Sequence, residues 1–121
     1  DIESAVQDLP EARKPLLRDI LTVLVDARCW IEDPPVRVRD YVNIRVPATF
    51  GEARIASMNR STGRIEFHDG SFDVARRAGV ADRFDEVTSS NAAAITVDDE
   101  GDRDAAVRLA EAFLALRRTS G

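Results

Sequence analysis

The spacing of apolar residues between positions 41 and 68 most constrains what this chain can fold into. Apolar and polar residues alternate there in three short runs, 41–46, 53–58 and 64–68, whereas on either side apolar residues recur every three or four positions. Alternation indicates strands with one buried face, and the longer spacing indicates helices with one buried face. A sheet that is apolar on one side needs helices to cover that side. The sequence therefore predicts an α+β fold.

One helix is predicted before the strands, over residues 9–30. Pro10 suits a first helical turn, and Pro15 allows the alternative that the helix begins later. Pro34 and Pro35 then stop helical propagation, which separates the helix from the first strand. The apolar face of this helix is formed by Leu16, Leu17, Ile20, Leu21, Leu24 and Val25.

The region after the alternating runs predicts three further elements. Ser71 should cap a short helix and Gly79 should end it. Residues 80–87 suit an irregular or helical bridge, and residues 91–98 suit a fourth strand. A final helix then runs to the end of the chain.

The final helix has clear signals at both ends. Asp102 or Asp104 should cap its first turn, and Arg117 and Arg118 complement the negative end of its dipole. Its apolar stripe is expected to consist of Val107, Leu109, Ala110, Phe113, Leu114 and Leu116.

Loops of hairpin length join the three alternating runs. They are "PATFGE" (47–52) and "NRSTG" (59–63), and each contains a glycine that can adopt positive φ. An antiparallel meander follows. The complete expectation is one α+β domain over residues 1–121, with a single four-stranded, mainly antiparallel sheet and the N- and C-terminal helices packed on one face.

The composition excludes several classes of protein. The chain has 121 residues, of which 44% are apolar, but it has no run of about 20 apolar residues, the length a membrane span needs. A soluble, cytoplasmic protein without a membrane partner is therefore expected. Its single cysteine, Cys29, excludes an internal disulfide and a cysteine-rich zinc site.

Positive charge is concentrated in the middle of an otherwise acidic chain. The net charge is −5, yet residues 37–64 hold six arginines against two acids, which gives +4. If Val46 lies opposite Ala53 and Ile55 opposite Phe67, then Arg45 faces Arg54, and Arg54 faces His68. The polar side of the sheet would then present Tyr41, Arg45, Arg54, Arg64 and His68.

Two interpretations of this polar side are open. Guanidinium groups beside aromatic rings are typical of sheets that bind RNA or single strands. The alternative is a solvated face crossed by charge pairs between strands, in which Glu66 pairs with Arg54 or Arg64.

No complete catalytic or metal-binding motif is present. His68, Asp69 and Asp73 suggest acid–base or metal chemistry, but a zinc site needs three or four ligands and the chain has one histidine. A histidine before an Asp-Gly turn is the simpler interpretation. The acidic stretch 98–104 lacks the glycine and glutamate spacing of a calcium loop. The sequence thus predicts no catalytic residue, no metal and no cofactor.

Trp30 and Met58 are candidate contact residues, because tryptophan and methionine are enriched at interfaces. Trp30 lies beside Cys29 at the end of the first predicted helix, where core packing or anchoring of the helix end is the alternative. Met58 falls on the exposed side of its predicted strand.

Three stretches resemble a bacterial domain of unknown function that is found alone or beside restriction-type nuclease modules. They are "LLRDILTVL" (16–24), "YVNIRVPATFGEARIASMNRSTGRIEFH" (41–68) and "AAITVDDEGDRDAAVRLAEAFL" (93–114). The resemblance implies an accessory or binding role and carries no active-site residue.

The leading functional hypothesis is a non-catalytic interaction or accessory module that binds a protein partner, or itself, by its sheet face or an edge strand. Nucleic-acid binding through the arginine-bearing sheet face is the alternative, and a small hydrolase-like enzyme around His68 is the third. The predicted binding residues are Tyr41, Arg45, Arg54, Met58, Arg64 and His68.

Overall fold

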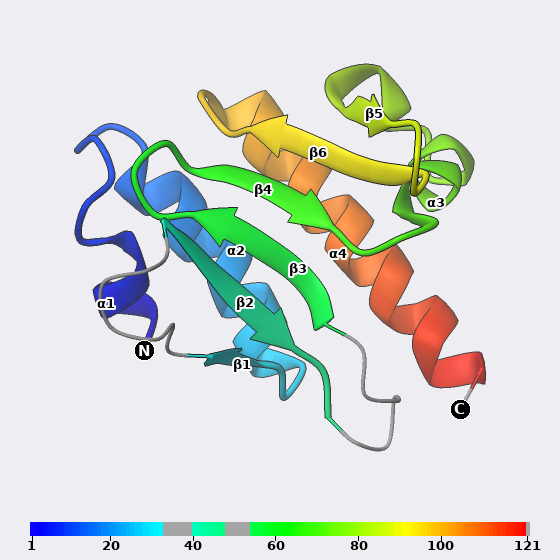
Figure 1. Cartoon of the computed structure of the whole chain (residues 1–121), viewed down its shortest axis with the longest axis horizontal. Helices are drawn as coiled ribbons and strands as arrows, with labels where there is room; N and C mark the ends of the chain where they lie inside the picture. Colours follow the sequence, from blue (N-terminus) through cyan, green and yellow to red (C-terminus); the bar gives the residue numbers. More distant parts are fainter. Residues whose placement is uncertain (33–39, 48–53, 121) are drawn as a thin grey trace.

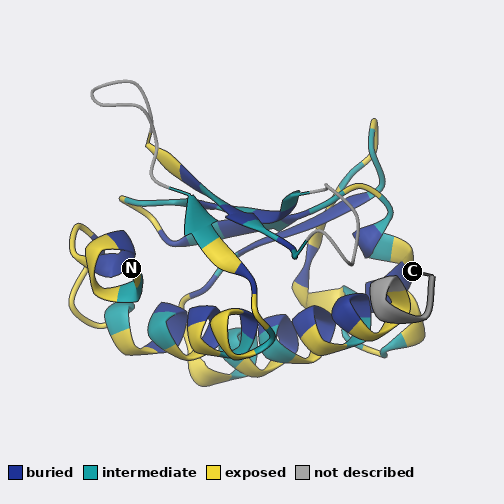
Figure 2. Cartoon of the chain, turned by 90° about the horizontal axis from the view of Figure 1, so that it is seen from below, coloured by how far each residue is buried: buried dark blue, intermediate teal, exposed yellow. Residues whose placement is uncertain are grey.

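A computed structural model describes residues 1–32, 40–47 and 54–120, with the side chains of 117–120 outside the description. The described helices lie together on one face of an antiparallel sheet, and the other face carries no described helix (Figure 1, Figure 2). The α+β class and the covering of one face are confirmed. The sheet has six strands rather than the predicted four, in the order β1-β2-β3-β4-β6-β5.

The elements follow one another along the chain without a repeat. They are α1 (Ile2–Val6), α2 (Lys14–Asp26), β1 (Trp30–Glu32), β2 (Tyr41–Arg45), β3 (Arg54–Asn59), β4 (Arg64–Phe67), α3 (Ser71–Arg77), a 3₁₀ helix (Ala81–Arg83), β5 (Asp85–Val87), β6 (Ala92–Thr96) and α4 (Glu100–Ser120).

The predicted meander is confirmed, because β2, β3 and β4 pair antiparallel in chain order. β6, the predicted fourth strand, lies beside β4. The two additional strands, β1 and β5, form the outer edges of the sheet (Figure 1). Each is three residues long, which is too short for an alternating pattern to be recognised.

The first long helix, α2, ends earlier than predicted. Lys14 and Pro15 form its first turn, and Arg28 after its C-terminus has a left-handed φ of 73°. The Arg28 N–H donates to the Val25 carbonyl at 2.9 Å, and the Cys29 N–H donates to the Leu24 carbonyl at 3.0 Å. This is the Schellman arrangement that terminates helices. Trp30 is therefore the first residue of β1 rather than part of a helix.

The final helix, α4, starts with a different cap from those predicted. The carboxylate of Asp99 accepts a hydrogen bond from the Asp102 N–H at 2.8 Å, so Asp99 caps the helix rather than Asp102 or Asp104. Of the predicted stripe, Val107 is half-buried and Leu116 is 41% exposed. The buried members are Leu109, Ala110, Phe113 and Leu114.

Ser71 has a different role from the predicted cap. Gly70, with a φ of 84°, precedes α3, and the hydroxyl of the fully buried Ser71 accepts a hydrogen bond from the Ala93 N–H of β6 at 2.8 Å. Gly79 ends the helix as predicted, with a φ of 77° directly after the C-cap residue Ala78. Ser71 therefore joins α3 to the sheet.

A β-bulge in β3 changes which side chains of that strand face the core. Arg45 lies opposite Arg54, as expected, but Ile44 lies opposite Ala56, so Ile55 is the additional residue. The Ile55–Phe67 pairing expected from the sequence is wrong, because Phe67 lies opposite Ala56. The expected partner of Val46, Ala53, lies outside the described residues.

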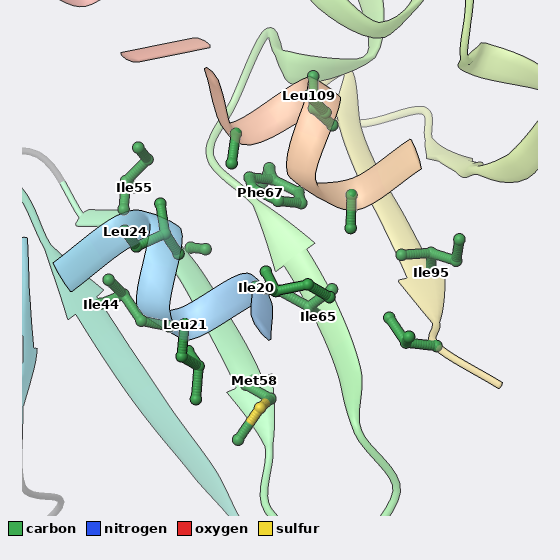
Figure 3. Packing of buried hydrophobic residues seen from close by; sticks show 14 of the residues in the cluster. Ile20, Leu21, Leu24, Ile44, Ile55, Met58, Ile65, Phe67, Ile95 and Leu109 are labelled. Carbon is green, nitrogen blue, oxygen red and sulfur yellow. The ribbon is translucent and has the colours of Figure 1, made fainter. Parts of the chain in front are cut away.

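The core lies between the sheet and the helices. Side chains of α2 meet side chains of β2, β3 and β4, and Leu109 of α4 lies over the β4 and β6 side (Figure 3). Phe67 makes an edge-to-face contact with Phe84, with ring centroids 6.3 Å apart. The α2 and strand residues of this core include Ile20, Leu21, Leu24, Ile44, Ile55, Met58 and Ile65.

Within the described ranges, no helix combines the length and the apolar character that crossing a membrane requires.

Candidate functional site

The open face of the sheet carries a polar row that crosses all six strands. The register places in one row Glu32, Asn43, Ser57, Glu66, Ala94 and Asp85. Three of these six residues are acidic. The middle of the open face is therefore negative or neutral, and no arginine lies in the row.

The predicted arginines lie on both sides of this row rather than together. Arg45 and Arg54 lie opposite each other at one end of the sheet, while Tyr41 and Arg64 lie near the β3–β4 turn at the other. Tyr41 and Arg45 are the two ends of the five-residue β2, about 13 Å apart at the rise of an extended strand. The structure thus divides the predicted arginine-bearing surface into two parts.

Glu32 of β1 holds the Arg45 side chain. Arg45 Nε donates to Glu32 Oε2 at 3.0 Å, and Asn43 Nδ2 donates to Glu32 Oε1 at 3.3 Å. The hydrogen bond from Arg45, followed by that from Asn43, lowers the pKa of the Glu32 carboxyl below its ordinary value. Both side chains of the ion pair are partly exposed. This pair ties the short edge strand β1 to β2.

Arg64 is also engaged, by residues distant in sequence. Arg64 Nη2 lies 3.0 Å from Asp85 Oδ2 of β5, and Arg64 Nη1 donates to Thr96 Oγ1 at 3.4 Å. The predicted pairing with Glu66 is not what the structure shows for Arg64. Within the described part of the chain, Arg54 makes no ion pair. The open face is in the main crossed by charge pairs between strands.

Met58 and His68 are placed differently from the other predicted residues. Met58 is fully buried, so the expectation that it lies on the exposed side of β3 is wrong. Its change of side follows from the bulge at Ile55. His68 follows β4 and is half-buried, and its backbone N–H donates to the Ile55 carbonyl at 2.9 Å. No group of three or more His, Cys, Asp or Glu side chains suited to a metal ion occurs among the described residues.

The edge strand β1 presents apolar side chains to solvent. Trp30 is 49% exposed and Val25, at the end of α2, is 39% exposed. Within the described residues, β1 pairs with β2 alone, so its outer edge has no strand partner there. The opposite edge strand, β5, instead carries the exposed acids Asp85 and Glu86. Charges on an edge disfavour the addition of another strand, so β1 is the more receptive edge.

An apolar groove adjoins β1. Its volume is about 510 Å³, within the size range of ligand-binding clefts. It lies where the start of α1, the end of α2 and β1 come together, and Figure 1 shows α1 beside β1 in this region. The described residues that line it are Asp1, Ile2, Glu3, Val25, Cys29, Trp30 and Ile31.

Glu3 at this groove is held from the neighbouring helix. Arg18 Nε donates to Glu3 Oε2 at 2.7 Å, and Arg18 Nη2 donates to Glu3 Oε1 at 3.1 Å. These hydrogen bonds lower the pKa of Glu3 and raise that of Arg18. The two-point contact holds α1 against α2 and so maintains one wall of the groove.

Sequence reasoning identified Trp30 as a contact candidate but assigned it to a helix end. The groove joins residues that are more than 20 positions apart, and no local pattern marks it. The exposed Trp30 beside Ile31 was the one available signal.

In comparisons with protein-family models, with curated proteins and with solved structures, this chain finds no match.

Proposed function

We propose that this chain is a non-catalytic interaction module that binds a protein partner, or a second copy of itself, along the edge strand β1 and the adjoining groove. The observation that carries the proposal is the coincidence of three features at one place: an edge strand without a described outer partner, an apolar groove, and the exposed Trp30. The accessory role implied by the sequence resemblance is part of the same proposal.

The energetics favour the groove over the edge as the main source of affinity. Three residues of strand offer only about 10 Å of backbone for added hydrogen bonds. Covering the exposed half of Trp30 would remove on the order of 100 Å² of mainly apolar surface from water, worth about 2–3 kcal/mol. A partner should therefore place apolar side chains in the groove while its backbone pairs with β1.

Two measurements test this proposal. The native chain is used to select binders from a phage-displayed random peptide library, and its self-association is followed by sedimentation over a range of concentrations. We expect enriched peptides, or concentration-dependent association, that Trp30→Ala removes. The matched control is Tyr41→Ala, an exposed aromatic residue at the far end of β2, which should keep the binding. Absence of both peptide selection and association in the native chain would contradict the proposal.

Nucleic-acid binding is the second candidate, supported by one observation. Arg54 lies opposite Arg45 and makes no ion pair within the described residues, which leaves a guanidinium group for a phosphate. The acidic middle row of the open face favours the first proposal instead. Fluorescence anisotropy with labelled DNA and RNA, at low and physiological salt, compares the native chain with Arg45→Ala/Arg54→Ala/Arg64→Ala. Salt-dependent binding that the triple variant loses would support this candidate.

A further inference from the structure

The groove beside β1 is apolar in its floor and acidic in its charged lining. Its described lining residues include two charged side chains, Asp1 and Glu3, and both are acids. The Asp1 carboxylate accepts a hydrogen bond from the Ser4 N–H at 2.8 Å and so caps α1 without being neutralised. A ligand that enters the groove therefore meets carboxylates and apolar side chains.

The end of α2 adds to the negative potential. Its last turn contains Asp26 and no basic residue, and the C-terminal end of a helix carries a partial negative charge of its carbonyl groups. The exposed Arg28 follows this end and offsets part of it. Two other nearby arginines, Arg18 and Arg45, are already bound to Glu3 and Glu32. Positive charge near the groove is thus largely engaged within the chain.

We infer that the groove takes an extended segment of a partner protein in which apolar residues are accompanied by lysine or arginine. This inference rests on the proposed function and names the class of partner. In an extended segment, alternate side chains point to the same side, so apolar residues can enter the groove while basic ones approach Asp1 and Glu3.

Charge also decides against a second copy as the occupant. A two-fold symmetric contact brings the same surface of both copies together. Each copy would then meet the acidic lining of the other, and like charges at close range oppose association. A basic segment instead gains from the same carboxylates.

The test uses two end-blocked hexapeptides, one of alternating lysine and valine and one of alternating glutamate and valine. Trp30 is the chain's one tryptophan, so its emission reports directly on the groove. We expect the lysine peptide to shift this emission and to bind about tenfold more tightly than the glutamate peptide, with affinity that falls as salt rises.

A matched pair of variants locates the effect. Asp1→Asn/Glu3→Gln removes the acidic lining while keeping hydrogen-bonding groups, and should reduce the preference for the lysine peptide several-fold. Asp69→Asn/Asp82→Asn removes two exposed acids that do not line the groove, with the same change in net charge, and should keep the preference.

Each contrary result has a defined meaning. Equal binding of both peptides at Trp30 would overturn the inference but leave the proposed function standing, because the groove would still bind a partner. An equal effect of both variant pairs would overturn it by assigning the preference to net charge. Failure of either peptide to shift Trp30 emission would overturn it too, whereas the proposed function is judged by peptide selection and sedimentation. A shift caused by raising the protein concentration alone would identify a second copy as the occupant.

Discussion

The Glu32 carboxylate lies against the Arg45 guanidinium across the outermost strand pair, with Arg45 Nε donating to Glu32 Oε2 at 3.0 Å. This contact and the backbone pairing hold β1 to the sheet. Because β1 is three residues long, its side-chain contacts matter more than they would in a longer strand.

Acid should weaken the attachment of β1. Hydrogen bonding to Arg45 lowers the pKa of Glu32 in the folded chain below its ordinary value of 4.5. The stabilisation is therefore present above pH 4.5 and is lost as the pH falls through the lowered folded-state pKa. Denaturant titrations between neutral pH and pH 3 should show an acid loss of stability that is smaller in Glu32→Gln. The control Glu66→Gln removes a carboxylate of the same row that makes no ion pair in the described residues, and should leave the profile nearly unchanged. An identical profile for both variants would contradict this assignment.

Replacing Arg28 by glycine should stabilise the protein. Arg28 has a φ of 73° directly after α2, a conformation that costs a residue with a Cβ about 1 kcal/mol relative to glycine. Arg28→Gly should raise the free energy of unfolding by about 0.5–1 kcal/mol, measured by denaturant titration. Gly79 occupies the equivalent position after α3, and a Cβ there would meet no atom within 4 Å. Gly79→Ala should thus lower stability by a similar amount. Destabilisation by Arg28→Gly would show that the arginine side chain matters more than its backbone.

Ser71→Ala should destabilise the junction between α3 and the sheet. The Ser71 hydroxyl is the acceptor for the buried Ala93 N–H, and loss of a partner for a buried donor costs about 1–3 kcal/mol. Amide hydrogen exchange at Ala93 should also accelerate. The exposed Ser61 provides the control, because Ser61→Ala should change stability by less than about 0.5 kcal/mol. Unchanged exchange at Ala93 in Ser71→Ala would argue against this hydrogen bond.

Met58→Ala tests the bulge in β3. A fully buried methionine should lose about 2–5 kcal/mol on truncation to alanine, whereas an exposed one should lose little. The neighbouring Ser57 faces the open side, so Ser57→Ala should be nearly neutral. The reverse order of the two effects would restore the strand parity expected without a bulge.

The elements that could be predicted are those with a pattern longer than a few residues. The period-two runs predicted β2, β3 and β4, and the helical stripes predicted the positions of α2 and α4. The ends of these elements were less predictable. The Schellman turn at Arg28, without a glycine, stopped α2 early and released Trp30 into β1. The bulge at Ile55 reversed the facing of Met58.

The candidate surface was predictable only in part. Sequence reasoning proposed binding by the sheet face or an edge strand and named Trp30, but the arginines it grouped are divided by the polar row. Their acidic partners, Glu32 for Arg45 and Asp85 for Arg64, come from the two short edge strands that no pattern marked.

The sequence by itself determined the α+β class, the antiparallel meander and the apolar sides of the long helices, because these depend on periodicity among residues close along the chain. The tertiary structure alone decided the strand order, the location of the sheet edges, the charge pairs on the open face and the groove beside β1. Those features depend on segments distant in sequence, and which segments meet is set by packing the whole core rather than by any local pattern.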